Sequence, residues 1–127
     1  MPVNGIGGLF FRAKDPEALT AWYKQHLGVG PGCGTDANGE TDQWSWLTQA
    51  GQTVFTPFKA DTDYWPADRS FMLNLRVTEL DALIESLKVA GIEVITKPEW
   101  DDPYAGRFAR IHDPEGNPIE LWEPPAS

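Results

Sequence analysis

Apolar and polar positions alternate from Leu73 to Val77, and residues 6–14, which carry apolar residues on both faces, also have the character of a strand. A period of two residues is typical of β-strands. Each of these stretches leads into apolar residues at helical spacing, which are Leu19, Trp22, Tyr23 and Leu27 in the first half and Leu80, Leu83, Ile84 and Leu87 in the second. The pattern therefore predicts one strand and one amphipathic helix in each half of the chain.

Residues with strong helix-end preferences bound both predicted helices. In the first helix, Asp15 suits the N-cap, Pro16 the first helical position and Gly28 the C-cap. In the second, Thr78 can act as the N-cap and the helix is expected to run to Gly91. These signals favour two short, separate helices.

Further strands are predicted after each helix, at 43–48 and 52–58 in the first half and at 92–97, 106–112 and 117–122 in the second. Residues 113–116 form a good turn sequence between the last two strands. Segments 30–42, 60–70 and 98–105 are expected to be loops. Both halves thus follow one plan, an α+β fold of two βαβββ modules within a single domain spanning 1–127. Module 1 covers about 5–59 and module 2 about 70–123.

Composition excludes several classes of protein. The formal net charge is −9 and the pI about 4.5, which disfavours a nucleic-acid surface because phosphate binding needs a basic one. No segment approaches the ~20 apolar residues of a membrane span, and the N-terminus lacks the features of a signal peptide. Cys33 is the only cysteine, so a reducing, cytoplasmic location is expected. Its glycine neighbours indicate an exposed loop and an incidental thiol.

The predicted strands have two unlike faces. One face is apolar and is expected to pack on the helices; it carries Leu9, Phe11, Ala13, Leu73, Leu75, Val77, Ile119 and Leu121. The other is mixed and carries Phe10, Arg12, Met72, Asn74, Arg76, Glu120 and Trp122. A mixed face is either exposed to solvent or lines a pocket. Its large apolar side chains favour a pocket, since they gain free energy on burial.

Three segments resemble a known superfamily: FRAKD at 11–15, WYKQHLG at 22–28 and, most specifically, DPEGNPIEL at 113–121. They are similar to the vicinal oxygen chelate superfamily, which includes glyoxalase I, extradiol dioxygenases and bleomycin- and fosfomycin-resistance proteins. The resemblance implies two βαβββ modules forming a curved, cup-shaped mixed sheet with helices on its outer face. It also implies a cup that is completed in a homodimer.

The positions that match the metal ligands of this superfamily do not form a metal site here. They are occupied by Gly8, Phe55, Met72 and Glu120. Only Glu120 offers a charged oxygen ligand, and a thioether such as Met72 does not suit Zn²⁺, Mg²⁺ or Mn²⁺. His26, late in a helix, and His112 do not complete a set. No metal and no other cofactor is expected.

Glu120 is the leading candidate for chemistry, either as a general base or as a structural ion-pair partner of Arg110 or Arg76. Arginine side chains could also receive an anionic or carbonyl-bearing ligand. Tyr64, Trp65, Trp100 and Tyr104, all in predicted loops, could add flat walls to a pocket. The candidate ligand-binding residues are Phe10, Arg12, Trp44, Trp46, Phe55, Met72, Asn74, Arg76, Phe108, Arg110 and Trp122.

Two functions fit these residues. The first is a metal-independent, small-molecule-binding protein that holds an aromatic or cationic compound in a cup-shaped pocket; aromatic faces and an acidic chain both attract cations. The second is a lyase or isomerase that acts on a small carbonyl compound, with Glu120 as general base and Arg110 as its electrostatic partner. Whether the protein is an enzyme stays open at this point. The expected partners are a small organic ligand and a second copy of the chain, with no nucleic acid or membrane.

Overall fold

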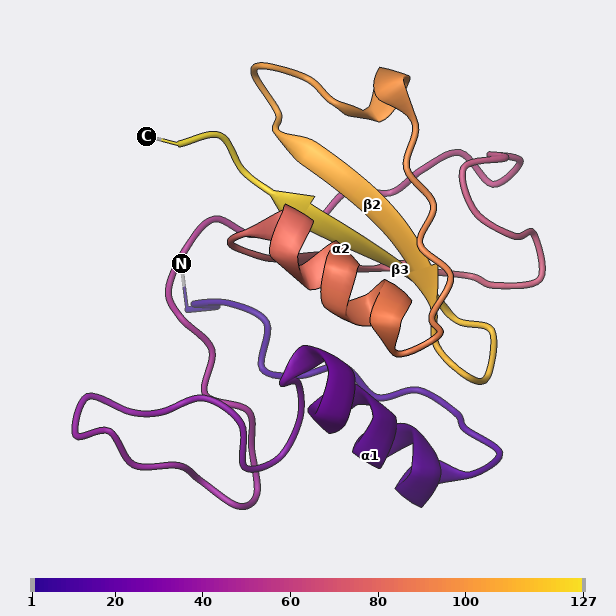
Figure 1. Ribbon diagram of the computed structural model, residues 1–127. Coiled ribbons are helices and arrows are strands. Elements are labelled where there is room, and N and C mark those ends of the chain that lie inside the picture. Colours follow the sequence, from indigo (N-terminus) through magenta and orange to yellow (C-terminus); the bar gives the residue numbers. More distant parts are fainter. Residues whose placement is uncertain (1, 127) are drawn as a thin grey trace.

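The computed structural model describes residues 2–126. Its elements, in chain order, are helix α1 (Pro16–Leu27), strand β1 (Leu73–Arg76), helix α2 (Leu80–Val89), the short 3₁₀ helix η1 (Pro98–Trp100), and strands β2 (Arg107–His112) and β3 (Pro118–Glu123). In Figure 1, α2 lies against the sheet and α1 runs below α2 in the view. Long irregular segments join α1 to β1. The fold is a small α+β arrangement.

The three strands form one mixed sheet in the order β1-β3-β2. The central strand β3 pairs parallel with β1 and antiparallel with β2. The predicted turn at 113–116 joins β2 to β3, and the N–H of Gly116 donates to the carbonyl of Asp113 at 2.9 Å. The three strands predicted at 71–77, 106–112 and 117–122 are therefore confirmed.

Helix α1 begins and ends as the sequence predicts. A side-chain oxygen of Asp15 accepts a hydrogen bond from the N–H of Ala18 at 3.1 Å, and Gly28 ends the helix with a φ of 65°. Helix α2 starts differently. Its N-cap is Glu79, not Thr78, and the carboxylate of Glu123 accepts from the Glu79 N–H at 2.8 Å. No side chain caps the first turn of α2. The Glu79 N–H is instead held by a residue at the end of β3, so local sequence could not reveal this start.

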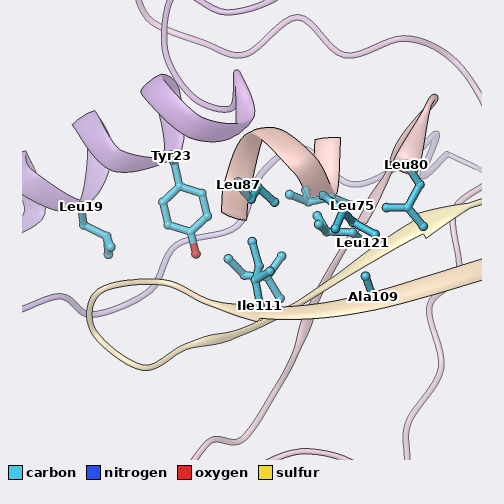
Figure 2. Close-up of a cluster of buried hydrophobic side chains, with 10 residues drawn as sticks. Leu19, Tyr23, Leu75, Leu80, Leu87, Ala109, Ile111 and Leu121 are labelled. Carbon is cyan, nitrogen blue, oxygen red and sulfur yellow. The ribbon is translucent and has the colours of Figure 1, made fainter. Parts of the chain in front are cut away.

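The core lies between the sheet and the two helices. The predicted apolar face supplies Leu75, Ile119 and Leu121. Strand β2 adds Ala109 and Ile111, and the helices supply Leu19, Tyr23, Leu80, Ile84 and Leu87. Figure 2 shows Leu19 and Tyr23 on α1 and Leu87 on α2 gathered with the sheet residues Ile111 and Leu121. Burial of these apolar side chains is the main force that holds the sheet against the helices.

A buried carboxylate ties α1 to the turn between β2 and β3. Tyr23 donates its hydroxyl hydrogen to Asp113 Oδ2 at 2.7 Å, and Asn117 Nδ2 donates to the same oxygen at 2.8 Å. The other oxygen, Oδ1, accepts from the N–H groups of Glu115 and Asn117. Burial, and then this hydrogen bond, raise the pKa of Tyr23 far above its usual value. The closing motif of the sequence thus has a structural role.

The strands predicted in the first half do not form. No strand is assigned in segments 6–14, 43–48 and 52–58. In the second half, the strand predicted at 92–97 is reduced to one bridge between Ile95 and Arg110. A strand is stable only when a neighbour accepts its backbone hydrogen bonds. In the described chain, 5–13 and 48–58 make no backbone–backbone hydrogen bond. The cup of two complete modules is therefore not seen within a single chain.

The surroundings of Cys33 also differ from expectation. The residue is 9% exposed, and its carbonyl accepts a hydrogen bond from the N–H of Leu47 at 2.9 Å. The flanking glycines indicated an exposed loop, but the loop folds back on residue 47. Its thiol is buried.

Candidate functional site

Three polar residues lie side by side across the mixed face of the sheet. Asn74 on β1 is paired with Glu120 on β3, and Glu120 is paired with Arg110 on β2. Residues that are opposite each other on neighbouring strands project from the same face. We call Asn74, Glu120 and Arg110 the polar row. The next row along the same face consists of Arg76, Trp122 and Phe108.

Glu120 is buried without an ion pair. It is 8% exposed, and its carboxylate accepts hydrogen bonds from the Tyr64 hydroxyl and, at 2.7 Å, from Asn74 Nδ2. Burial, and then the bond to Glu120, raise the pKa of Tyr64 to about 12, so the phenol is a stable donor at neutral pH. Within residues 2–126, Glu120 forms no salt bridge with Arg110 or Arg76. The ion pair of Glu120 with Arg110 or Arg76, which the sequence offered as its structural role, is therefore wrong.

Arg110 is the most unusual group in the row. It is 5% exposed, and its guanidinium carbon lies 4.8 Å from the centre of the Tyr64 ring and 5.4 Å from that of Trp100. Such cation–π contacts stabilise the charge. They leave its donors unused, because Nε and Nη2 are buried and have no hydrogen-bond partner. Two buried N–H donors at one arginine are a costly arrangement.

Four aromatic side chains form what we call the aromatic cover: Phe58, Tyr64, Trp65 and Trp100. Phe58 lies 5.7 Å from Tyr64 and 5.0 Å from Trp65, and Tyr64 lies 6.0 Å from Trp100, all measured between ring centres. The cover comes from two loops, 58–65 and the η1 segment. It closes over the row through Tyr64, which contacts both Glu120 and Arg110.

The second row provides a flat aromatic surface. The rings of Phe108 and Trp122 are stacked, with centres 6.3 Å apart and planes at 6°. Trp122 is 6% exposed and donates its indole N–H to the carbonyl of Ala105 at 2.8 Å. Arg76 does not face this pair with a free charge, since its guanidinium donates to the carbonyls of Gln49 and Gln52 at 2.9 and 2.6 Å.

The candidates from the second half come together, whereas those from the first half do not. Asn74, Arg76, Phe108, Arg110, Glu120 and Trp122 share one face of the sheet, and half-buried Met72 directly precedes β1. Phe10, Trp44 and Phe55 are 95%, 88% and 87% exposed. Arg12 and Trp46 are also exposed, and none of these five contacts the polar row by a hydrogen bond or an aromatic pair.

Sequence reasoning undervalued Tyr64 and Trp100. Both were expected only as loop aromatics, yet they cover the two buried charges. The available signal was their position: large aromatic side chains in polar loops lose free energy when they stay in water. Tyr104, the other strong loop candidate, is 92% exposed and takes no part.

Two hollows of the surface lie elsewhere. One is about 10 Å³ and is lined by apolar residues including Phe11, Tyr23 and Phe71, which is too small for more than a water molecule. The other is a shallow depression on the outer side of α1 between Pro16 and Lys24. Neither touches the polar row. In this conformation Glu120 and Arg110 of the row are buried beneath the aromatic cover.

The residues present do not suit a divalent metal. No group of three or more His, Cys, Asp or Glu side chains that could hold one occurs between residues 2 and 126. At the positions that match metal ligands, Gly8 and Phe55 offer no donor. Both oxygens of Glu120 already accept hydrogen bonds. A four-ligand site of the kind that binds Zn²⁺ cannot be built from these groups.

A family model matches most of the chain. The model of the Glyoxalase/Bleomycin resistance protein/Dioxygenase superfamily matches residues 5–121. No curated protein matches the chain. No helix between residues 2 and 126 is both long and apolar enough to cross a membrane.

Two solved structures share the fold. TnmS3, an antibiotic binding protein from Streptomyces sp. CB03234, is 21% identical with a TM-score of 0.59, and the match covers 98% of each chain. A member of the same superfamily from Sphaerobacter thermophilus DSM 20745 is 17% identical with a TM-score of 0.57, covering 97% of this chain and 99% of the other. At these identities the likeness establishes the fold alone.

Proposed function

Because the chain belongs to the Glyoxalase/Bleomycin resistance protein/Dioxygenase superfamily, we propose that it is a metal-independent protein that binds a small aromatic compound on the mixed face of its sheet. The observation that carries the proposal is the burial of Arg110 and Glu120 beneath the aromatic cover. Binding sites combine apolar walls with a few placed polar groups, and this face has both. The antibiotic binding protein among its structural relatives supports a binding role.

An aromatic ligand is better supported than a cationic one. The stacked rings of Phe108 and Trp122, and the rings of the cover, offer flat surfaces to a planar compound. A cation would meet the guanidinium of Arg110 directly beside Glu120, and two like charges repel strongly where water is excluded. The acidic net charge attracts cations only at long range.

The alternative is a lyase or isomerase with Glu120 as general base. A buried carboxylate next to a phenol and a guanidinium favours it, because such groups can move a proton and stabilise an oxyanion. Against it, both carboxylate oxygens of Glu120 accept hydrogen bonds from Tyr64 and Asn74. A substrate would have to compete with Tyr64 or Asn74 for an oxygen of this carboxylate.

Glu120→Gln separates the two functions. We expect it to leave the affinity for a neutral aromatic ligand within a few-fold of wild type, because the amide keeps the shape of the carboxyl group. The ligand comes from a thermal-shift screen of planar aromatic compounds: a compound at 100 times its Kd stabilises the protein by about 2.7 kcal/mol. Calorimetric titration of both proteins gives the affinities.

The same variant tests catalysis. If Glu120 is a general base, turnover of a small carbonyl substrate should fall by roughly 10²-fold or more in Glu120→Gln while the substrate still binds. Glu85→Gln, an exposed residue on α2, serves as the control with the same change of charge. Turnover that is lost only in Glu120→Gln would contradict the binding function and establish the enzyme.

The functional form is proposed to be a cytoplasmic homodimer in which a second copy completes module 1. Segments 5–13 and 48–58 lack backbone partners within the chain. They also carry exposed apolar side chains, including Phe10, Val54 and Phe55. Unpaired extended segments of this kind pair readily with another chain, and each copy then gains both a strand partner and a cover for its aromatic residues.

Light scattering at micromolar concentration should therefore give twice the chain mass of 14.1 kDa. Val54→Lys and Phe55→Lys together should shift the protein toward the monomer, because two charges would be buried at the interface. Val89→Lys, at an equally exposed apolar position on α2, should not. A wild-type particle of 14.1 kDa would contradict the dimer.

A further inference from the structure

We propose that the free edge of the Arg110 guanidinium is the recognition point for a carboxylate, and that the ligand of the mixed face is an aromatic carboxylate. This inference rests on the proposed binding function and narrows it to one chemical class. It starts from two buried donors, Nε and Nη2, that have no partner in the described chain.

The unused donors are not a general feature of arginines on this sheet. Arg107, also on β2, donates to Asp81 at 2.9 Å and lies 3.9 Å from Glu123. Arg76 on β1 donates to two backbone carbonyls. Arg110 is more deeply buried than either, yet it has no acceptor for these two groups. Arg69, outside the sheet, also has a buried Nε without a partner, but its Nη2 donates to the carbonyl of Glu115, so it leaves no complete edge unused.

The identity of the two atoms indicates which acceptor fits. Nε–H and one N–H of Nη2 point in parallel from the same side of the planar guanidinium, and this edge binds both oxygens of a carboxylate in a bidentate pair. A single carbonyl oxygen would satisfy only one donor well. The rings of Tyr64 and Trp100 lie near the guanidinium carbon, and neither ring supplies an acceptor to the two donors. The edge formed by Nε and Nη2 therefore keeps the right geometry for a carboxylate.

The apolar part of the ligand is indicated by the surroundings of that edge. Two rings of the aromatic cover, Tyr64 and Trp100, lie close to Arg110, and Lys97 Nζ lies 5.3 Å from the centre of the Trp100 ring. Lys97 adds a second positive charge near Trp100, whereas Glu120, paired with Arg110 across the sheet, repels an anion. The net charge of −9 repels anions at long range, so selectivity for a carboxylate has to come from the local contact with Arg110.

Entry of the ligand requires the cover to move, because Nε and Nη2 are shielded from solvent. The segment that carries Tyr64 is lightly held. Its backbone makes one hydrogen bond to itself, from Thr62 N–H to the Lys59 carbonyl at 3.0 Å. Tyr64 joins it to the sheet, through the hydrogen bond to Glu120 and the contact of its ring with Arg110. Segments with few backbone hydrogen bonds open at low free-energy cost, so a ligand can displace Tyr64 without unfolding the sheet.

The test compares 2-naphthoate with 2-naphthylmethylammonium, two probes that share a ring system and differ in charge. Quenching of tryptophan fluorescence gives both affinities. Wild type should prefer the carboxylate by at least about 10-fold, the scale of one charge-assisted pair. Arg110→Met keeps the length of the side chain and should abolish the preference. Lys88→Met, an exposed position on α2 with the same change in net charge, should retain it.

A measurement on the unaltered protein covers the case in which Arg110→Met does not fold. In a ¹H–¹⁵N spectrum, the Nε–H signal of Arg110 should move downfield on addition of 2-naphthoate and stay in place with 2-naphthylmethylammonium; an Arg110→Lys sample identifies the signal. Equal binding of the two probes, or an Nε–H signal that does not respond to 2-naphthoate, would overturn this inference and leave the binding function standing. Binding of neither probe, together with no aromatic hit in the thermal-shift screen, would overturn the binding function as well.

Discussion

Asp113→Ala is expected to lower the free energy of unfolding by about 3 kcal/mol or more. The change removes the acceptor of four hydrogen bonds, from Tyr23, Glu115 and, twice, Asn117. Asp113 is 4% exposed, so water replaces the lost acceptor poorly. A buried donor left without a partner costs about 1–3 kcal/mol. Urea denaturation with an unchanged m-value would report the loss as a lower midpoint.

Tyr23→Phe removes the hydrogen bond between Asp113 and α1 and keeps the hydrogen bonds of Asp113 within the turn. It removes one donor and leaves Asn117 and the turn amides on Asp113, so we expect a loss of about 1–2 kcal/mol. Tyr104→Phe is the matched control, because Tyr104 is 92% exposed. It should change the midpoint very little. If Asp113→Ala cost no more than Tyr23→Phe, the turn contacts would contribute nothing and the account of this motif would be wrong.

The second large effect is expected at Gly106, where β2 begins beside the candidate site. Gly106 has a φ of 119°, which side chains rarely adopt. A Cβ there would collide with the carbonyl oxygen of Glu123 and lie 3.0 Å from the indole nitrogen of Trp122. Gly106→Ala should therefore cost about 2–4 kcal/mol, combining backbone strain and overpacking. It should also weaken ligand binding by displacing Trp122.

Gly91→Ala is the control that measures the cost of backbone strain without a steric clash. Gly91 also has a positive φ, 82°, but a Cβ built there meets nothing within 4 Å. We expect a loss of about 1–2 kcal/mol from strain and no change in ligand affinity. Equal losses for the two variants would show that the close approach to Trp122 and Glu123 has no energetic consequence.

The second half of the chain was largely predictable because its signals are local. Alternation of apolar residues, the turn at 113–116 and the parity of residues 72–77 and 117–122 place Asn74, Glu120 and Trp122 on one face, as the structure confirms. Parity depends only on the two-residue period of a strand. The same argument failed for Phe10, since a strand pattern does not supply a pairing partner.

The interior of the site was not predictable from the sequence. The pairing of Glu120 with Tyr64 and the position of Tyr64 over Arg110 join residues 56 and 46 positions apart in the chain. No local pattern encodes contacts of this range. An ion pair between Glu120 and Arg110 was the simpler expectation, because the two side chains are opposite each other on neighbouring strands. The intervening phenol and the amide of Asn74 satisfy the carboxylate in its place.

The most direct test of the central claim is a map of where an aromatic ligand binds. A ¹H–¹⁵N titration of wild-type protein with the compound that raises Tm most in the thermal-shift screen gives this map residue by residue. We expect the largest shifts at the aromatic cover and the two rows beneath it, including the backbone amides of Tyr64, Arg110 and Glu120 and the indole N–H of Trp122. Shifts concentrated on the outer faces of α1 and α2, with these four signals unmoved at saturation, would contradict it.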